Sequence, residues 1–214
     1  MIFEKRKRIG FGCILFVIAL LAIDQIIKIS VKTSMFLHES IKITNWFYIS
    51  FIENNGMAYG ISFIPKPLLS SFRMVACCFL VWYLFKEIKS GARLIWIILV
   101  SMVLAGAIGN LIDCMFYGLI FSDSSFYYEA YLVAFGTGYA PFLEGRVVDM
   151  FYFPLVVTTY PEWVPFYGGE PFIFFSPIFN FADACISTGV ISIILFCHKE
   201  LSKISNTLHQ NTDE

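Results

Sequence analysis

The sequence predicts an all-α polytopic membrane protein with four transmembrane helices, a small extracytoplasmic β-rich cradle and an enlarged outer loop region. The first observation is composition: 58% of the 214 residues are hydrophobic and only 14% are charged, whereas soluble domains carry about a quarter charged residues. Mean hydropathy is accordingly high, at +0.73. The second observation is that the apolar residues fall into four long runs. We therefore expect a single integral membrane domain over residues 1–214.

The four apolar runs mark the predicted spans, which cover about residues 9–29, 68–85, 94–113 and 179–197. The first run follows the basic stretch 4–8 and so resembles a signal peptide. It is too long for one, however, and no small-residue cleavage site closes it. We interpret it as a retained transmembrane helix, because about 20 apolar residues span the hydrocarbon core of a bilayer.

The distribution of lysine and arginine predicts the orientation of the chain. Basic residues are concentrated before the first span, in the loop 86–93 and after the last span, and an excess of this kind is typical of cytoplasmic segments. We therefore expect both termini in the cytoplasm and the long segments 31–66 and 116–177 outside. Short β-like pieces at 41–44 and 46–52 predict the cradle.

Two aspartates, Asp149 and Asp183, lie among apolar residues. An ionisable side chain at membrane depth is costly, so it is by default a candidate functional residue. Two carboxylates brought together cannot both ionise easily, so one keeps a proton and the other can act as a base. Such a pair can activate water for attack on a peptide carbonyl. We therefore predict that Asp149 and Asp183 are catalytic.

Other chemistries have little support in the sequence. The three histidines are scattered and no nucleophile elbow is present, which disfavours zinc and serine chemistry. Neither a metal nor a cofactor is expected. No phosphate-binding loop or RNP-type motif is found, so nucleic acid is not an expected partner.

Polar residues at helical spacing accompany the aspartates. Asn110 and Asp113 are three residues apart and are expected to share a helix face, and Asn180 precedes Asp183 by the same interval. Asp113 is either solvated at a helix end or supports the site from behind Asn110. Asp24 and Lys28 are four residues apart, and an intrahelical ion pair would explain both.

Five short motifs, in this order, resemble those of the lipoprotein signal peptidase family, also called signal peptidase II. They are Asp24-Gln25-Ile26-Ile27-Lys28, Glu53-Asn54-Asn55-Gly56-Met57-Ala58-Tyr59-Gly60, Gly106-Ala107-Ile108-Gly109-Asn110-Leu111-Ile112-Asp113, Val147-Val148-Asp149-Met150 and Phe179-Asn180-Phe181-Ala182-Asp183. The resemblance implies an aspartic endopeptidase of the bacterial cytoplasmic (inner) membrane. Such an enzyme removes the signal peptide of diacylglyceryl-modified prolipoproteins just before the lipidated cysteine.

The resemblance also implies roles for individual residues. Asp149 and Asp183 match the catalytic pair, near the outer face of the membrane. Residues expected to line the site or bind substrate are Asp24, Asn54, Gly56, Asn110, Asp113, Arg146 and Asn180.

The chain departs from the family pattern in two ways. The family usually has arginine directly after the aspartate matched by Asp113, whereas this chain has Cys114, so Arg146 and Arg73 are the candidate cations for the site. Two inserts, 119–145 and 152–176, are expected to enlarge the outer cap.

The expected partners are prolipoproteins and membrane lipids, and the chain is expected to act as a monomer. We expect the lipidated cysteine to enter sideways from the bilayer and the substrate helix to lie against the small-residue face of Gly106 and Gly109. Asn54 would then hydrogen-bond the substrate main chain.

Two other classes of function remain open from the residues alone. Buried aspartates also occur in small proton-coupled carriers, although the chain lacks the internal repeats typical of transporters. A non-catalytic binder of lipidated segments is the second alternative. An anchor for a soluble domain is disfavoured, because the outer segments are short and aromatic.

Overall fold

The computed structural model describes residues 2–55 and 65–202. The chain forms two compact units. One, the helical unit, comprises Met1–Gln25, Pro67–Ile112 and Phe181–Glu214, and the other, the sheet unit, comprises Ile26–Lys66 and Asp113–Asn180.

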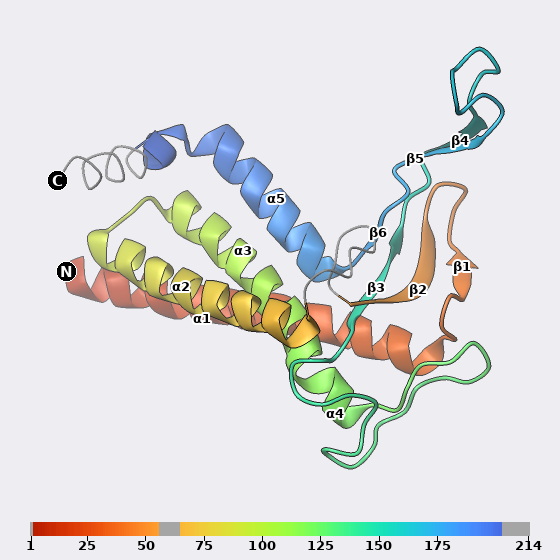
Figure 1. Cartoon of the computed structure of the whole chain (residues 1–214). Coiled ribbons are helices and arrows are strands. Elements are labelled where there is room, and N and C mark those ends of the chain that lie inside the picture. Colours follow the sequence, from red (N-terminus) through yellow and green to blue (C-terminus); the bar gives the residue numbers. More distant parts are fainter. Residues whose placement is uncertain (1, 56–64, 203–214) are drawn as a thin grey trace. The chain divides into compact units, whose positions relative to one another are not determined.

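Long apolar helices make up the helical unit (Figure 1). They are α1 (Ile2–Ser34, of which residues up to Gln25 belong to this unit), α2 (Lys66–Ser90), α3 (Leu94–Ile112) and α5 (Phe181–Phe196). Within the described residues, three helical stretches are long and apolar enough to cross a membrane: Glu4–Ser34, Lys66–Ser90 and Leu94–Ile120. At 16 residues, α5 is apolar but shorter. The protein is thus a membrane protein with three clear candidate spans.

Helix α3 is the most buried of the candidate spans and forms the centre of the helical unit. A buried apolar cluster joins it to its neighbours, and its members are Cys13, Leu84, Trp96, Ile97, Leu99, Val100, Leu104 and Cys197.

Glycines on α3 allow the backbone of α5 to pack directly against the backbone of α3. A Cβ atom added to Gly106 would lie 2.3 Å from the Ala182 carbonyl oxygen, and one added to Gly109 would lie 2.7 Å from Asp24 Oδ2. The small-residue face therefore packs against the chain's own α5 and α1. The prediction that this face receives the substrate helix is wrong, because the chain itself fills it.

The sheet unit contains a four-stranded antiparallel sheet in the order β1-β2-β3-β6 (Figure 1). Its strands are β1 (Ser40–Lys42), β2 (Tyr48–Asn54), β3 (Val147–Tyr152) and β6 (Ile178–Phe179). The sequence analysis predicted only the first two of these regions. β3 and β6 come from the second long segment, so the two segments share one sheet.

The sequence analysis predicted that the third span ends at residue 113, but the helix that contains α3 continues beyond it. It continues as a π-helical segment, η2 (Asp113–Tyr117), and a last turn, α4 (Gly118–Ile120). The insert that follows folds back onto this turn: the amide of Ala140 donates to the Gly118 carbonyl, and the amide of Gly145 donates to the Cys114 carbonyl. A second buried cluster lies here and consists of Val31, Met35, Phe51, Tyr117, Phe121, Val148 and Met150.

The insert 152–176 forms a separate hairpin of β4 (Val156–Thr159) and β5 (Pro171–Phe174), which projects from the four-stranded sheet (Figure 1). Its tip exposes Trp163 and Phe166, the latter completely. Phe166 has a φ of 68°, a left-handed conformation that is uncommon for an aromatic residue.

The close packing of α3 on α5 predicts the effect of a single methyl group. Gly106→Ala should lower the free energy of unfolding by about 1–3 kcal/mol, because a new Cβ cannot fit beside a backbone oxygen without moving a helix. Thermal unfolding in detergent micelles measures the effect. Gly12→Ala is the control, because its added Cβ meets nothing within 4 Å. Equal midpoints for the two variants would contradict the packing described here.

Candidate active site

Asp149 lies on β3 and is almost fully buried. Two carboxamides hold it, one at each oxygen. Asn54 Nδ2 donates to Asp149 Oδ2 at 3.2 Å, and Asn180 Nδ2 donates to Asp149 Oδ1 at 2.6 Å. N–H donors to an ionised acceptor form strong hydrogen bonds. The Asp149 carboxylate is therefore fixed in position and in orientation.

The sheet explains why these two amides reach Asp149. Antiparallel pairing sets Ile52 opposite Asp149 and Asn54 opposite Val147, next to an irregularity in the register of β2. Asn180 follows β6, which pairs with β3 at Phe151. One carboxamide therefore lies at the end of a strand that flanks β3, and the other lies directly after the strand on the other side.

Asp183 lies in the first turn of α5 and is partly buried. Asn110 Nδ2, near the end of α3, donates to Asp183 Oδ1 at 2.7 Å. The start of a helix favours a negative charge, because its free N–H groups and its dipole point toward it. Asp183 thus has a carboxamide partner and a favourable helix position, both within the helical unit.

Asp24 has a structural role within the helical unit. Its Oδ1 accepts the backbone N–H of Ala182 at 2.9 Å, in the first turn of α5, where N–H groups lack intrahelical partners. Gln25 Nε2 donates to Asp24 Oδ2 at 3.0 Å and to the Gly109 carbonyl at 3.3 Å. These contacts join α1 to the neighbouring helices α3 and α5.

Asp113 is completely buried and lies 2.8 Å from Lys28 Nζ, which is also completely buried. Its Oδ2 also accepts the Val148 N–H at 3.4 Å, a long hydrogen bond. The interpretation of Asp113 as a solvated helix end is therefore wrong. The ammonium of Lys28 contacts Asp113, a partner that the sequence analysis did not predict.

Arg146, a candidate cation for the site, belongs to a different cluster. Its Nη1 lies 2.8 Å from Glu53 Oε2 and 2.8 Å from Asp123 Oδ1. Lys32 Nζ contacts the other oxygen of Glu53, to which Ser124 also donates. Lys28, which was not among the candidate cations, contacts Asp113.

This cluster controls the charge of Glu53. Burial alone would raise the pKa of Glu53, but the attraction of Lys32 and hydrogen bonds from Lys32, Arg146 and Ser124 outweigh it and hold the pKa below its ordinary value of 4.5. Glu53 directly precedes Asn54 on β2. The cluster therefore fixes the strand that presents Asn54 to Asp149.

The sequence analysis missed Lys32, Glu53, Asp123 and Ser124. One signal was available: Lys28 and Lys32 are four residues apart in an apolar helix, where cations are rare and usually find partners. The predicted residue Gly56 lies outside the described residues.

Glu53 should make the stability of the protein depend on pH. A carboxyl group with a lowered pKa in the folded state stabilises the fold above its unfolded pKa, and this contribution is lost as pH falls through the folded pKa. Glu53→Gln should therefore cost about 3–5 kcal/mol at pH 7, since it leaves Lys32 buried without its partner. Below pH 4.5, its stability should fall less steeply than that of the wild type.

Unfolding midpoints between pH 3 and pH 7 test this expectation. Glu129→Gln, an exposed change of equal charge, is the control and should follow the wild type. Parallel wild-type and Glu53→Gln profiles below pH 4.5 would contradict it.

The chain is similar to known proteins over most of its length. A family model described as signal peptidase (SPase) II matches residues 16–199. A lipoprotein signal peptidase of Porphyromonas gingivalis is 46% identical over 92% of this chain and 89% of the relative. A lipoprotein signal peptidase of Amoebophilus asiaticus is 38% identical over 83% of this chain and 75% of the relative.

The fold is also similar to that of a solved structure, a bacterial membrane enzyme. The TM-score is 0.60, with 24% identity and coverage of 90% of both chains. The family match begins within the first span, extends past the end of α5 and includes the site residues from Asp24 to Asp183. This chain belongs to the signal peptidase II family.

Proposed function

We propose that this protein removes the signal peptide from prolipoproteins, just before a cysteine that carries a diacylglyceryl group. Membership of the signal peptidase II family makes it a peptidase, and its relatives are lipoprotein signal peptidases. The observation that carries the proposal is the buried Asp149 carboxylate, held by a carboxamide at each oxygen. Such an arrangement suits a group that must hold a reacting water in one place.

Asp149 and Asp183 act as the catalytic pair in this proposal. Asn180, which donates to Asp149, is only three residues before Asp183 in the chain, so the chain path allows both carboxylates to serve one site. Two neighbouring carboxylates share a proton, because both cannot ionise easily. The ionised one takes a proton from water as it attacks the peptide carbonyl, and the protonated one gives its proton to the leaving nitrogen.

The surrounding residues then divide by role. Asn54, Asn110 and Asn180 orient the two carboxylates and line the substrate path, and Asn54 also hydrogen-bonds the substrate main chain. Asp24 and Asp113 hold backbone in place around them. Arg146 acts through Glu53.

The membrane arrangement in this proposal has four spans. Helix α5 is the fourth: at about 1.5 Å per residue, its 16 residues cover about 24 Å, short of the about 30 Å hydrocarbon core. Helical hydrogen bonds from Cys197 to Ile193 and from Leu201 to Cys197 continue it, however. Both termini lie in the cytoplasm, and the sheet β1-β2-β3-β6 forms a cradle for substrate at the outer face, within a single integral domain.

The substrate in this proposal reaches the site from the side. The diacylglyceryl chains stay in the bilayer while the peptide enters the site, so membrane lipids contact the substrate and the enzyme during the reaction. The protein acts as a monomer in the bacterial cytoplasmic membrane.

Replacing either catalytic aspartate should abolish cleavage without loss of the fold. In a gel-shift assay with purified protein and a diacylglyceryl-modified precursor, Asp149→Asn and Asp183→Asn should each lower the rate at least about a hundredfold, as loss of a general acid or base does. Glu129→Gln is the control, because Glu129 is exposed and this variant removes one carboxylate charge outside the site.

A carrier or a non-catalytic binder of lipidated segments would give a different result. The wild type would then leave the precursor intact under all conditions. Full activity in Asp183→Asn, with the precursor cut at the same bond, would show that the pair is not the catalytic group.

A further inference from the structure

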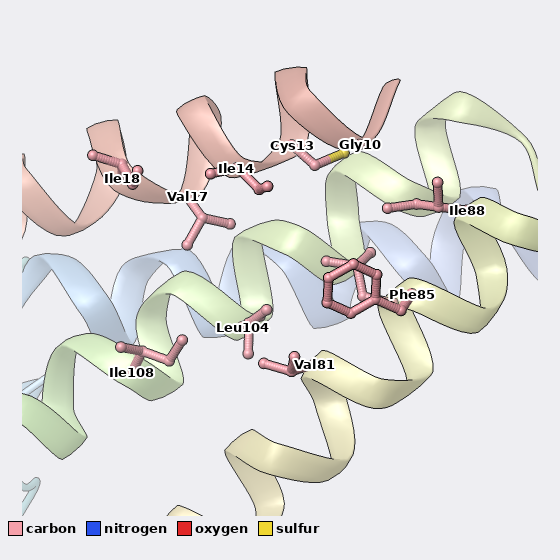
Figure 2. Close-up of a pocket in the computed structure, with 11 residues that line it drawn as sticks. Gly10, Cys13, Ile14, Val17, Ile18, Val81, Phe85, Ile88, Leu104 and Ile108 are labelled. Carbon is pink, nitrogen blue, oxygen red and sulfur yellow. The ribbon is translucent and has the colours of Figure 1, made fainter. Parts of the chain in front are cut away.

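Two apolar grooves flank Cys13 of α1 in the helical unit. The first, of about 230 Å³, is lined by α1, α2 and α3, and Figure 2 shows Ile14, Val17 and Leu104 along it. Its lining includes no charged side chain. It can therefore accept an acyl chain but offers nothing to a headgroup.

The second groove has a charged end. It has a volume of about 440 Å³, within the about 300–1,000 Å³ typical of ligand pockets. Gly12, Phe16 and Ile98 line its apolar length, between α1 and the start of α3, and Lys5 and Arg8 line one end. Lys5 and Arg8 are three residues apart on α1, so they lie on the same face of the helix.

The neighbouring basic residues have other surroundings. Lys7 lies 3.8 Å from Glu4, and Arg6 lies over Gly91 at the turn between α2 and α3. Lys5 and Arg8 are thus the two of these four cations that line the groove. A groove with an apolar wall and two cations at its end is complementary to an anion that carries a hydrocarbon chain.

We propose that this groove is a binding site for one anionic phospholipid. The phosphate lies between Lys5 and Arg8, and one acyl chain lies along Gly12 and Phe16 toward Ile98. Gly12 makes the site possible, because a Cβ there would meet nothing within 4 Å and would stand in the open groove. The site is separate from the proposed catalytic residues and does not depend on the proposed function.

Native mass spectrometry of the purified full chain tests the proposal. The probes are phosphatidylglycerol and phosphatidylcholine with identical acyl chains, added singly and in competition. The wild type should bind a first phosphatidylglycerol at least tenfold more tightly than phosphatidylcholine. Lys5→Gln with Arg8→Gln should lower phosphatidylglycerol affinity about 30-fold, since each basic residue near an anionic headgroup contributes about fivefold.

Two further variants separate the groove from diffuse surface charge. Lys5→Gln alone should lower phosphatidylglycerol affinity about fivefold. Lys7→Gln removes the same charge two residues further along α1 but outside the groove, so it should change the affinity less than twofold. Gly12→Leu should lower the affinity at least tenfold with every charge intact, because its side chain fills the groove.

Several results would overturn the proposal. Equal binding of the two lipids by the wild type would show that the headgroup is not recognised. Equal losses in Lys5→Gln and Lys7→Gln would show that only surface charge acts. Unchanged binding in Gly12→Leu, with an unchanged unfolding midpoint, would show that the acyl chain lies elsewhere.

Discussion

The sheet unit depends on one buried carboxylate, that of Asp113. It contacts the Lys28 ammonium and the Val148 amide, so it joins α1, η2 and β3. Both charges are completely buried, and either one alone would be strongly destabilising. The pair therefore forces these three elements to assemble together. The next residue on β3 after Val148 is Asp149. The contact that holds Val148 therefore also fixes the backbone position of the proposed catalytic Asp149.

The two proposed catalytic aspartates have related but unequal surroundings. Asp149 is buried in a sheet and has a carboxamide at each oxygen, whereas Asp183 is partly exposed at the start of a helix and has one from Asn110. This asymmetry is useful chemically, because an acid and a base need different environments.

Apolar runs and charged residues among apolar ones were enough to predict the helices and the two candidate catalytic aspartates. Asp149 and Asp183 stood out because a carboxylate among apolar residues is costly, and the small-residue pattern at Gly106 correctly predicted close helix packing. The partner of that face was misassigned, since spacing does not say whether the chain or a ligand fills it. The strand β3 was missed for a similar reason: a short apolar run around Asp149 is equally compatible with a helix.

Long-range ion pairs were the other failure. The contact of Lys28 with Asp113 was not predicted, because it depends on how distant segments fold and not on spacing along one helix. The π-helical η2 has no simple sequence signal either, yet it contains Asp113 and Cys114. Local rules predicted the elements and their polar residues, and tertiary packing decided the partners.

The contact between Gly145 and Cys114 limits which side chains can stand at position 114. Cys114 is 1% exposed, its carbonyl accepts the Gly145 amide, and a Cβ at Gly145 would lie 2.1 Å from the Asp113 carbonyl oxygen. The end of the insert 119–145 thus packs against the backbone of η2 at position 114, and a side chain as long as arginine there would be sealed from solvent.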